Sequence, residues 1–568
     1  MKICLAICLL FLLALHADAQ QSFNQYNKKF VHGSGIIISH NSQRVLSNLD
    51  IIGKIWGILK YYHPNVRAGK YNWDFELFNL IGKIYDAPPQ IRDLKLCRWI
   101  KRFGSIDSNA FKKKSREIAK MEPNFSWIES SPIQPKLRKI LKWFTNISND
   151  STSFYVQMGE IPISKFNNEN PYSEFSFPDD GYRLLALFRY WNVIKYYYPY
   201  RYNFEKKWDS ILPFEIGRFL KVKNELTYKL AILELITQIQ DSHARIVEGD
   251  QSIEDLLGKN RVPVEVGFIE NKPVVIGYYD SILGPASGLR KGDVILGING
   301  REVHKIIESN WPFTPASNNA VKFRQLAFNF LRTNDTLVKL RIRRADTTME
   351  FNVKTIPSYL LDIYYRAHIK DTCFKIYNNI AYINPWFIRT AYIPEILQQA
   401  AHTKGLVIDL RNPIKENMQP ILDYFLDKEK PFAKITRPSN TCPGEFTFFK
   451  TMTVGKNAKV RYECPIILLV NENTQSSAEF NVMAFRTYKK TIVIGSTTAG
   501  ADGNVTTVCL PGGVLTSFTS LGVYYNDYSE TQLIGIIPDI SITPSISGII
   551  KGHDEILQKA IEVLEKAN

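Results

Sequence analysis

The sequence predicts a multidomain α+β protein with a duplicated N-terminal helical module, a β-rich domain and a C-terminal α/β core. Its 568 residues suffice for three or four domains of about 150 residues each. Three observations predict this order: an aromatic helical pattern that occurs twice, short alternating strands over 262–357, and alternating apolar strands and helices from residue 373. We place the two helical copies at 20–180 and 181–255, the β-rich domain at 256–357 and the core at 358–568.

Residues 1–19 have the pattern of a secretory signal peptide. Lys2 forms a short positive region, Ile3–Leu15 is apolar apart from its cysteines, and Ala17-Asp18-Ala19 gives a small-x-small cleavage site. We therefore expect an exported protein, periplasmic or extracellular, that begins near Gln20 and has no integral membrane segment after cleavage. An uncleaved anchor is the alternative interpretation.

Composition argues against several classes of protein. The formal net charge is +16, but Lys and Arg are scattered, and the densest basic run, at 112–116, is too short for a nucleic-acid arm. We therefore expect no nucleic-acid partner. There is no CxxC pair, no HExxH motif and no phosphate loop, so no metal and no cofactor are predicted.

An odd number of widely spaced cysteines remains after the predicted signal peptide. This number does not fit a disulfide framework, and we expect mostly buried thiols. Cys442 and Cys464 are the candidate pair for one incidental bridge. The cysteines in question are Cys97, Cys373, Cys442, Cys464 and Cys509.

The helical pattern is repeated at an offset of 135 residues. The segment 56–64 resembles 191–199, and Trp73-Asp74 matches Trp208-Asp209 at the same offset. Pro64 and Pro199 should end the two helices, and the tyrosines before each proline are interpreted as core and helix-end packing. One residue out of step, 107–110 matches 241–244. Because Asn109 stands where the second copy has His243, and Asn cannot act as a general base, any catalytic role belongs to the second copy.

The β-rich domain contains one specific string, at 288–300. Its alternating apolar residues end in Asn299-Gly300, a strong hairpin signal. The string resembles PDZ domains of bacterial proteases, which implies capture of a peptide by strand addition at a sheet edge. The predicted peptide-binding residues are Gly288, Leu289, Gly292 and Asp293. A small β-domain without a ligand is the alternative.

The core pattern places a serine where chemistry is expected. Apolar strands at 405–410, 465–470 and 491–495 alternate with helices and indicate a largely parallel sheet. In such sheets the functional site lies beyond the carboxyl ends of the strands, where residues 471–480 occur. Ser476 is the candidate nucleophile, because N–H groups at the start of the following helix can stabilise an oxyanion. The serines could instead simply cap that helix.

The order of motifs resembles the tail-specific, or C-terminal processing, serine proteases. It comprises the helical region, Asp241-Ser242-His243, the PDZ-like domain, Asp409-Leu410-Arg411-Asn412, the turn at 471–480 and the strand at 535–539. The resemblance covers about 180–568. It implies an α/β (crotonase-like) protease core in which Ser476 is the nucleophile.

The resemblance also selects the base. One branch of the family uses a lysine about 25 residues after the serine, but that position is Ala501 here. The branch that includes tricorn-like and nisin-resistance-like proteases uses a histidine before the core, which maps to His243. His243 would take the proton of Ser476 and return it to the leaving amine.

The group that orients the imidazole is left open. Tricorn-like members use a Glu shortly before the 535–539 strand, and the nearest position here is Gln532, with Glu530 two residues earlier. Ser242, Glu479 and Glu530 are all candidates. Glu479 ranks first because it lies one helical turn from Ser476, and a surface or capping carboxylate is the alternative interpretation.

The predicted oxyanion loop also departs from the family. Members usually carry a Gly pair after Asp-Leu-Arg-Asn, whereas this chain has Pro413-Ile414-Lys415, and proline has no N–H to donate. The N–H of Ser477 next to the nucleophile remains, and Ile414 is the candidate second donor.

These observations favour an exported serine endopeptidase that binds an unstructured or C-terminal peptide and cleaves it at Ser476, with a polypeptide as its partner. The first alternative is a non-catalytic peptide-binding protein that keeps the protease fold. The second is an envelope- or polysaccharide-binding scaffold, which aromatic richness and positive charge suggest.

Overall fold

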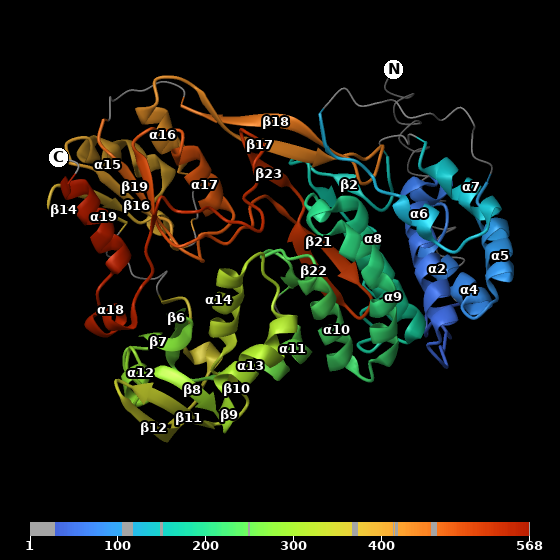
Figure 1. Ribbon diagram of the computed structural model, residues 1–568, viewed down its shortest axis with the longest axis horizontal. Helices are drawn as coiled ribbons and strands as arrows, with labels where there is room; N and C mark the ends of the chain where they lie inside the picture. Colours follow the sequence, from blue (N-terminus) through green and yellow to red (C-terminus); the bar gives the residue numbers. More distant parts are fainter. Residues whose placement is uncertain are drawn as a thin grey trace, which may run out of the picture. The chain divides into compact units, whose positions relative to one another are not determined.

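The computed structural model describes residues 29–104, 118–147, 152–247, 250–365, 373–412, 414, 418–455 and 463–566 (Figure 1). The predicted signal peptide, the 107–116 region and Pro413 lie outside these residues. The chain divides into two compact units. Unit 1 comprises Met1–Leu235, Thr436–Phe448 and Val505–Leu521, and unit 2 comprises Ile236–Ile435, Phe449–Asn504 and Gly522–Asn568.

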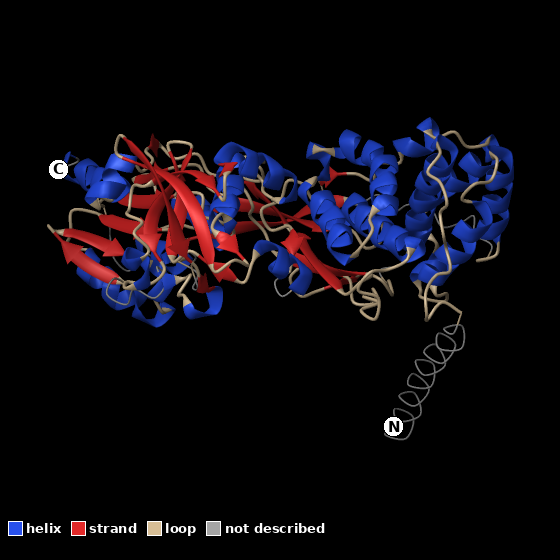
Figure 2. Cartoon of the chain, turned by 90° about the horizontal axis from the view of Figure 1, so that it is seen from below, coloured by secondary structure: helices blue, strands red, loops and turns tan. Residues whose placement is uncertain are grey.

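Unit 1 is mostly helical, as the blue segments of Figure 2 show. Its helices are α2 (Gln43–Tyr62), α3 (Pro64–Arg67), α4 (Trp73–Ile84), α5 (Pro89–Lys101), α6 (Ser126–Ser130), α7 (Pro135–Phe144), α8 (Asp180–Tyr197), α9 (Glu205–Lys221) and α10 (Glu225–Thr237). Its strands are β1 (Ala119–Met121), β2 (Gln157–Met158), β3 (Ser164–Lys165), β21 (Val505–Leu510) and β22 (Val514–Thr519).

The sequence repeat has a structural counterpart in paired indoles. The Trp56 indole donates to the Trp73 carbonyl and the Trp73 indole donates to the Trp56 carbonyl, both at 3.0 Å. The second copy repeats this exchange between Trp191 and Trp208, at 2.9 and 3.1 Å. The first pair joins α2 to α4 and the second joins α8 to α9, so the repeated sequence pattern has a repeated local structure at these four tryptophans.

The two long helices, α2 and α8, pack against each other. A Cβ added at Gly57 would lie 1.8 Å from the Asn192 side-chain oxygen, so only glycine fits this contact. The Asn192 amide donates to the Gly53 carbonyl at 3.1 Å. Both helices end two residues before their proline, as predicted. The tyrosines at these ends are buried, which confirms their core role (Tyr61, Tyr62, Tyr196 and Tyr197).

Late segments of the chain complete unit 1. The Arg189 guanidinium donates to the Cys509 carbonyl at 2.8 Å. The Tyr228 hydroxyl donates to the Pro511 carbonyl at 2.7 Å, and the Tyr62 hydroxyl donates to the Pro443 carbonyl. These donors are buried helix residues. The acceptors from 436–448 and 505–521 therefore bind polar groups in the core that would otherwise lack these hydrogen bonds.

The β-rich domain of unit 2 follows the predicted strands. The short elements β4 (Arg245–Ile246) and α11 (Gln251–Leu257) come before it. Its own elements are β5 (Asn260–Arg261), β6 (Val264–Ile269), β7 (Lys272–Tyr278), α12 (Leu283–Ala286), β8 (Val294–Ile298), β9 (Arg301–Glu302), α13 (Val303–Asn310), α14 (Asn319–Asn329), β10 (Arg332–Thr333), β11 (Leu337–Arg344), β12 (Thr347–Lys354) and β13 (Ile356–Pro357). The main sheet has the order β12-β11-β8-β7-β6. Asn299 and Gly300 have φ of 49° and 78°, as a type I′ hairpin requires.

The α/β core forms a sheet of order β14-β15-β16-β19-β20-β24, in which only β14 is antiparallel within the described residues. Its strands are β14 (Phe374–Tyr377), β15 (Ile380–Ile383), β16 (Leu406–Asp409), β19 (Ile466–Val470), β20 (Thr491–Gly495) and β24 (Ile540–Ser541). Its helices are α15 (Ile393–Ala400), α16 (Gln419–Phe425), α17 (Ser477–Phe485), α18 (Ile546–Lys551) and α19 (Glu555–Lys566). Ile467 and Leu469 pack with Ile556, Ala560 and Leu564 of α19, which covers one face.

Further strands were not predicted from the sequence, among them β17 (Lys430–Pro438), β18 (Phe446–Val454) and β23 (Gly522–Tyr525), of which the first two have residues in both units. The predicted strand at 535–539 was wrong: Gly535 has φ 76°, Pro538 has no N–H for a ladder, and the strand β24 begins only at Ile540. No disulfide joins Cys442 to Cys464 or links any other described cysteine, so the prediction of an incidental bridge was wrong. Across the described part of the chain, every helix is too short or too polar to cross a bilayer.

Candidate active site

Ser476 stands at a strained turn between a buried strand and a helix. Strand β19 ends at Val470 and helix α17 begins at Ser477. Ser476 has φ 57° and ψ −120°, a conformation that is costly for any residue with a Cβ and that concentrates at functional sites. Its N–H donates to the Ala501 carbonyl at 3.0 Å, which holds the turn. The residue is half-buried, and the adjacent Ser477 is exposed.

Glu479 anchors this turn to the loop at 498–501. Its buried carboxylate accepts N–H groups of Ser476 at 3.3 Å, Gly500 at 2.8 Å and Ala501 at 3.1 Å, and the hydroxyl of Thr498. Burial raises the pKa of Glu479, and these hydrogen bonds oppose the rise. None of these bonds goes to His243, so its predicted role toward the imidazole stays a prediction.

The turn that carries His243 is tied to the same loop. The Ser242 hydroxyl donates to the Ala499 carbonyl at 3.1 Å and accepts the Ser317 N–H at 2.9 Å. The Gln475 amide donates to the Ser242 carbonyl at 3.4 Å. The loop at 499–501 therefore joins the predicted nucleophile, at Ala501, to the predicted base turn, at Ala499.

Charged groups around His243 act in opposite directions. The side chain is 10% exposed, and burial holds the pKa of His243 below its ordinary value. Asp241 raises this pKa, whereas Arg245 and Arg324 lower it. The imidazole is therefore set toward the neutral form, which is the form a general base needs.

Two contributions to this region were not predicted from the sequence. Asp241 is fully buried, and its Oδ1 lies 4.0 Å from Nδ1 of His243. The sequence feature that could have identified Asp241 is its position two residues before the histidine. Arg324 of α14 donates to the Gln475 side chain at 2.8 Å, and Asn318 donates to the Thr498 carbonyl at 2.9 Å, so the β-rich domain also contacts the nucleophile turn. No sequence motif pointed to these contacts.

Gln532 and Glu530, two further candidates for orienting the imidazole of His243, lie in different surroundings. Gln532 is 1% exposed, and its amide donates to Asp241 Oδ1 at 3.5 Å. Glu530 is half-buried, and its backbone forms a bridge with Tyr524. Gln532 therefore reaches the His243 turn through Asp241.

The predicted oxyanion loop is anchored at both ends. Arg411 pairs with Asp409 at 2.6 Å and with Asp554 at 2.7 Å, and the Met418 N–H donates to Asn481 of α17 at 3.1 Å. The Thr474 hydroxyl donates to the carbonyl of Leu410 at 2.8 Å.

The two predicted oxyanion donors are the backbone N–H groups of Ser477 and Ile414. Ile414 is half-buried within the anchored loop, and Ser477 opens α17. A role for either N–H stays a prediction.

The predicted peptide-binding residues lie in the loop before β8. Leu289 is 1% exposed and belongs to the core of the β-rich domain. Asp293 is 1% exposed and pairs with Arg344 at 2.6 Å. Arg344 also donates to the Gly288 carbonyl, and a Cβ at Gly292 would meet Ile550 of α18 at 2.2 Å. These contacts hold the loop in place, so peptide binding by the four residues stays a prediction.

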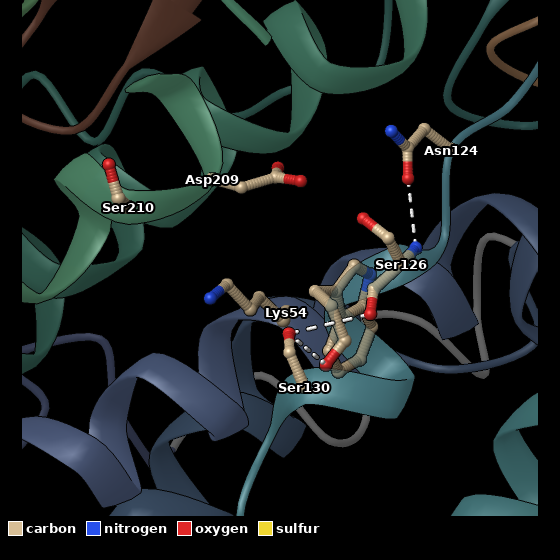
Figure 3. Close-up of a pocket in the computed structure, with 7 residues that line it drawn as sticks. Lys54, Asn124, Ser126, Ser130, Asp209 and Ser210 are labelled. Carbon is tan, nitrogen blue, oxygen red and sulfur yellow. Dashed lines mark hydrogen bonds between the residues drawn. The ribbon is translucent and has the colours of Figure 1, made fainter. Parts of the chain in front are cut away.

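A pocket in unit 1 contains none of the predicted site residues (Figure 3). Its volume is about 350 Å³, and the Lys54 ammonium and the Asp209 carboxylate face it. Lys54 pairs with Asp50 at 2.8 Å and Asp209 pairs with Lys195 at 2.6 Å, so both charges are compensated. Within the described residues, no cluster of three His, Cys, Asp or Glu side chains is arranged to hold a metal ion.

Solved structures share the fold of most of the chain. Mature CPAF complexed with lactacystin is 14% identical with a TM-score of 0.54, and the alignment covers 68% of this chain and 99% of that one. Mature CPAF alone gives 15% identity, a TM-score of 0.53, and coverage of 67% and 96%. Identities this low show a common fold and nothing about individual residues.

Sequence comparisons identify the C-terminal part. The carboxy-terminal-processing protease of Bartonella bacilliformis is 30% identical over 159 residues, which is 27% of this chain and 34% of that protein. Residues 379–542 match the model described as Peptidase family S41; the match includes Ser476 and Gln532 but not His243. The chain therefore carries a domain of peptidase family S41.

Proposed function

We propose that the protein is an exported serine endopeptidase that cleaves unstructured or C-terminal segments of polypeptides. The observation that carries the proposal is the strained Ser476 turn, which shares its supporting loop with the His243 turn. The S41 domain supports peptide-bond hydrolysis, and the secretory pattern at residues 1–19 supports export. The curated relative, a carboxy-terminal-processing protease by name, supports the substrate class.

The proposed reaction is a two-step acyl transfer. Ser476 Oγ bonds to the carbonyl carbon of the substrate while its proton passes to His243. Negative charge then develops on the carbonyl oxygen, and the N–H groups of Ser477 and Ile414 are the proposed donors to it. His243 gives the proton to the leaving nitrogen as the C–N bond breaks. Water, deprotonated by His243, hydrolyses the resulting ester and restores Ser476.

Degradation of an unfolded test protein by the mature chain tests this proposal. We expect Ser476→Ala and His243→Ala each to lower the rate by on the order of 10³-fold or more, because nucleophile and base act as one unit. Circular dichroism and melting curves of both variants serve as the control for folding. Cleavage by Ser476→Ala at the wild-type rate would reject Ser476 as the nucleophile.

A non-catalytic peptide-binding protein is the second candidate. Gln532 at the usual Glu position and Pro413 in the oxyanion loop favour it. A fluorophosphonate probe separates the candidates, because only an activated serine reacts with it. Labelling of wild type but not of Ser476→Ala supports the enzyme. Absence of labelling together with binding of an unfolded peptide supports the binding protein.

A further inference from the structure

Asp241 is the carboxylate that the structure pairs with His243. Its Oδ1 accepts the His243 backbone N–H at 3.0 Å and lies 4.0 Å from Nδ1 of the ring. Asp241 is fully buried, so its charge acts through little water. A carboxylate on the Nδ1 side favours the tautomer that carries its proton there, which leaves Nε2 free to accept a proton.

Gln532 contacts the same carboxylate oxygen from another part of the chain. Its amide Nε2 donates to Asp241 Oδ1 at 3.5 Å, and the residue is 1% exposed. An amide does not ionise, so Gln532 can orient Asp241 but cannot supply negative charge. In this cluster the negative charge therefore comes from Asp241.

The two other charged groups of the described residues that shift the pKa of His243 are cationic. Arg245 of β4 and Arg324 of α14 both disfavour the imidazolium, as does burial. A base in these surroundings would lose basicity without a compensating anion. Asp241 is the group that opposes both arginines.

We propose that Asp241 is the positioning residue for His243, that its carboxylate stabilises the imidazolium formed during the reaction, and that Gln532 holds this carboxylate in place. This inference rests on the proposed function. When Ser476 Oγ bonds to the substrate carbon, its proton moves to Nε2 and the ring becomes a cation. No proton passes to Asp241 in these steps. The ring becomes neutral again when the proton passes to the leaving nitrogen.

The alternative is that Asp241 only builds the turn, and Asp241→Asn distinguishes the two. Asparagine keeps an oxygen that can accept the His243 backbone N–H and the Gln532 amide N–H, but it removes the negative charge. We expect kcat to fall by about 10²–10⁴-fold with little change in KM. The acidic limb of the rate–pH profile should move to lower pH, because His243 loses the anion that raises its pKa. A purely structural role predicts unchanged kcat and an unmoved profile, and either result would overturn the proposal.

An NMR titration of His243 decides the inference without activity. The His243 signal is assigned with His243→Gln, and its pKa is compared in wild type and Asp241→Asn. We expect a lower pKa in the variant, and an equal pKa overturns the inference. If wild type neither cleaves nor reacts with the fluorophosphonate, the proposed function fails while this titration still tests Asp241.

A second variant covers the case in which Asp241→Asn does not fold. Gln532→Met removes the hydrogen bond to Asp241 at similar volume and leaves all charges in place. We expect kcat to fall by roughly tenfold or more with KM retained, because a misplaced carboxylate stabilises the imidazolium poorly. An unchanged kcat in Gln532→Met would show that Gln532 does not hold the Asp241 carboxylate in place, and it overturns the proposal. A large loss of kcat in Glu530→Gln, with none in Gln532→Met, would assign the positioning role to Glu530 and also overturns it.

Discussion

A further buried carboxyl group, besides those of Glu479 and Asp241, lies close to the candidate site, at Asp502. Its Oδ1 accepts the Gly503 N–H at 2.7 Å, whereas its Oδ2 has no hydrogen-bond partner among the described residues. Burial, together with the nearby carboxylate of Glu479, raises the pKa of Asp502 well above its ordinary value. Asp502 therefore keeps its proton in the folded protein over a range of pH in which an exposed aspartate has lost it.

Asp502→Asn should stabilise the protein increasingly as pH rises. In the unfolded chain Asp502 ionises near its ordinary pKa of about 4. Above that pH the unfolded state binds fewer protons than the folded state, so wild-type stability falls with rising pH until the folded pKa is passed. Asparagine removes this dependence. Melting temperatures measured between about pH 3 and pH 8 should show a growing advantage for the variant, and a lower melting temperature for it at pH 8 would contradict this account.

The crossing of α2 and α8 depends on a residue without a side chain. Gly57 lies directly against Asn192, whose amide bonds to Gly53 on α2 and to the Phe188 carbonyl on its own helix. The two copies of the helical module are therefore joined by a contact that has no space for a methyl group.

Gly57→Ala should destabilise the protein by about 1–3 kcal/mol, because overpacking displaces Asn192 from its bonds. Gly82→Ala in α4 is the matched control, since a Cβ there meets nothing within 4 Å. Alanine at this second site should be neutral or stabilising by up to about 1 kcal/mol, the gain in helix propensity. Denaturant unfolding measures both, and equal effects would show that the crossing tolerates a side chain.

Elements with a local pattern were predictable, whereas those that depend on distant partners were not. The strand Thr491–Gly495 has the predicted bounds, and the helix predicted after Ser476 begins at Ser477, because their apolar runs and turn residues are contiguous. Strand β17 was missed because charged residues interrupt it and prolines lie near both ends. Ser476 and His243 were found through motifs. Asp241 stood in the same string, but its pairing with Gln532 joins residues 291 positions apart, which no periodicity reveals.

The whole mature chain should contain five thiols and no disulfide. None of the five cysteines beyond the predicted signal peptide, all of them described, forms a disulfide, and the Cys464 thiol donates to the Thr403 carbonyl at 3.3 Å. Titration of the denatured chain should therefore count five thiols, and a reductant should leave the melting temperature unchanged. Fewer thiols together with a melting temperature that falls on reduction would show a bridge that the structure lacks.

The late segments of unit 1 have a consequence for biosynthesis. Domains usually fold in the order in which they leave the ribosome. Here Arg189 and Tyr228 obtain acceptors from residues 509 and 511, and Tyr62 obtains one from residue 443. The helical unit emerges first but must wait, with polar groups in its core unsatisfied, until almost the entire polypeptide has been synthesised. Folding of the helical unit, which is synthesised first, is thus completed only late in translation. A nascent chain halted before residue 505 should remain sensitive to proteases throughout its helices.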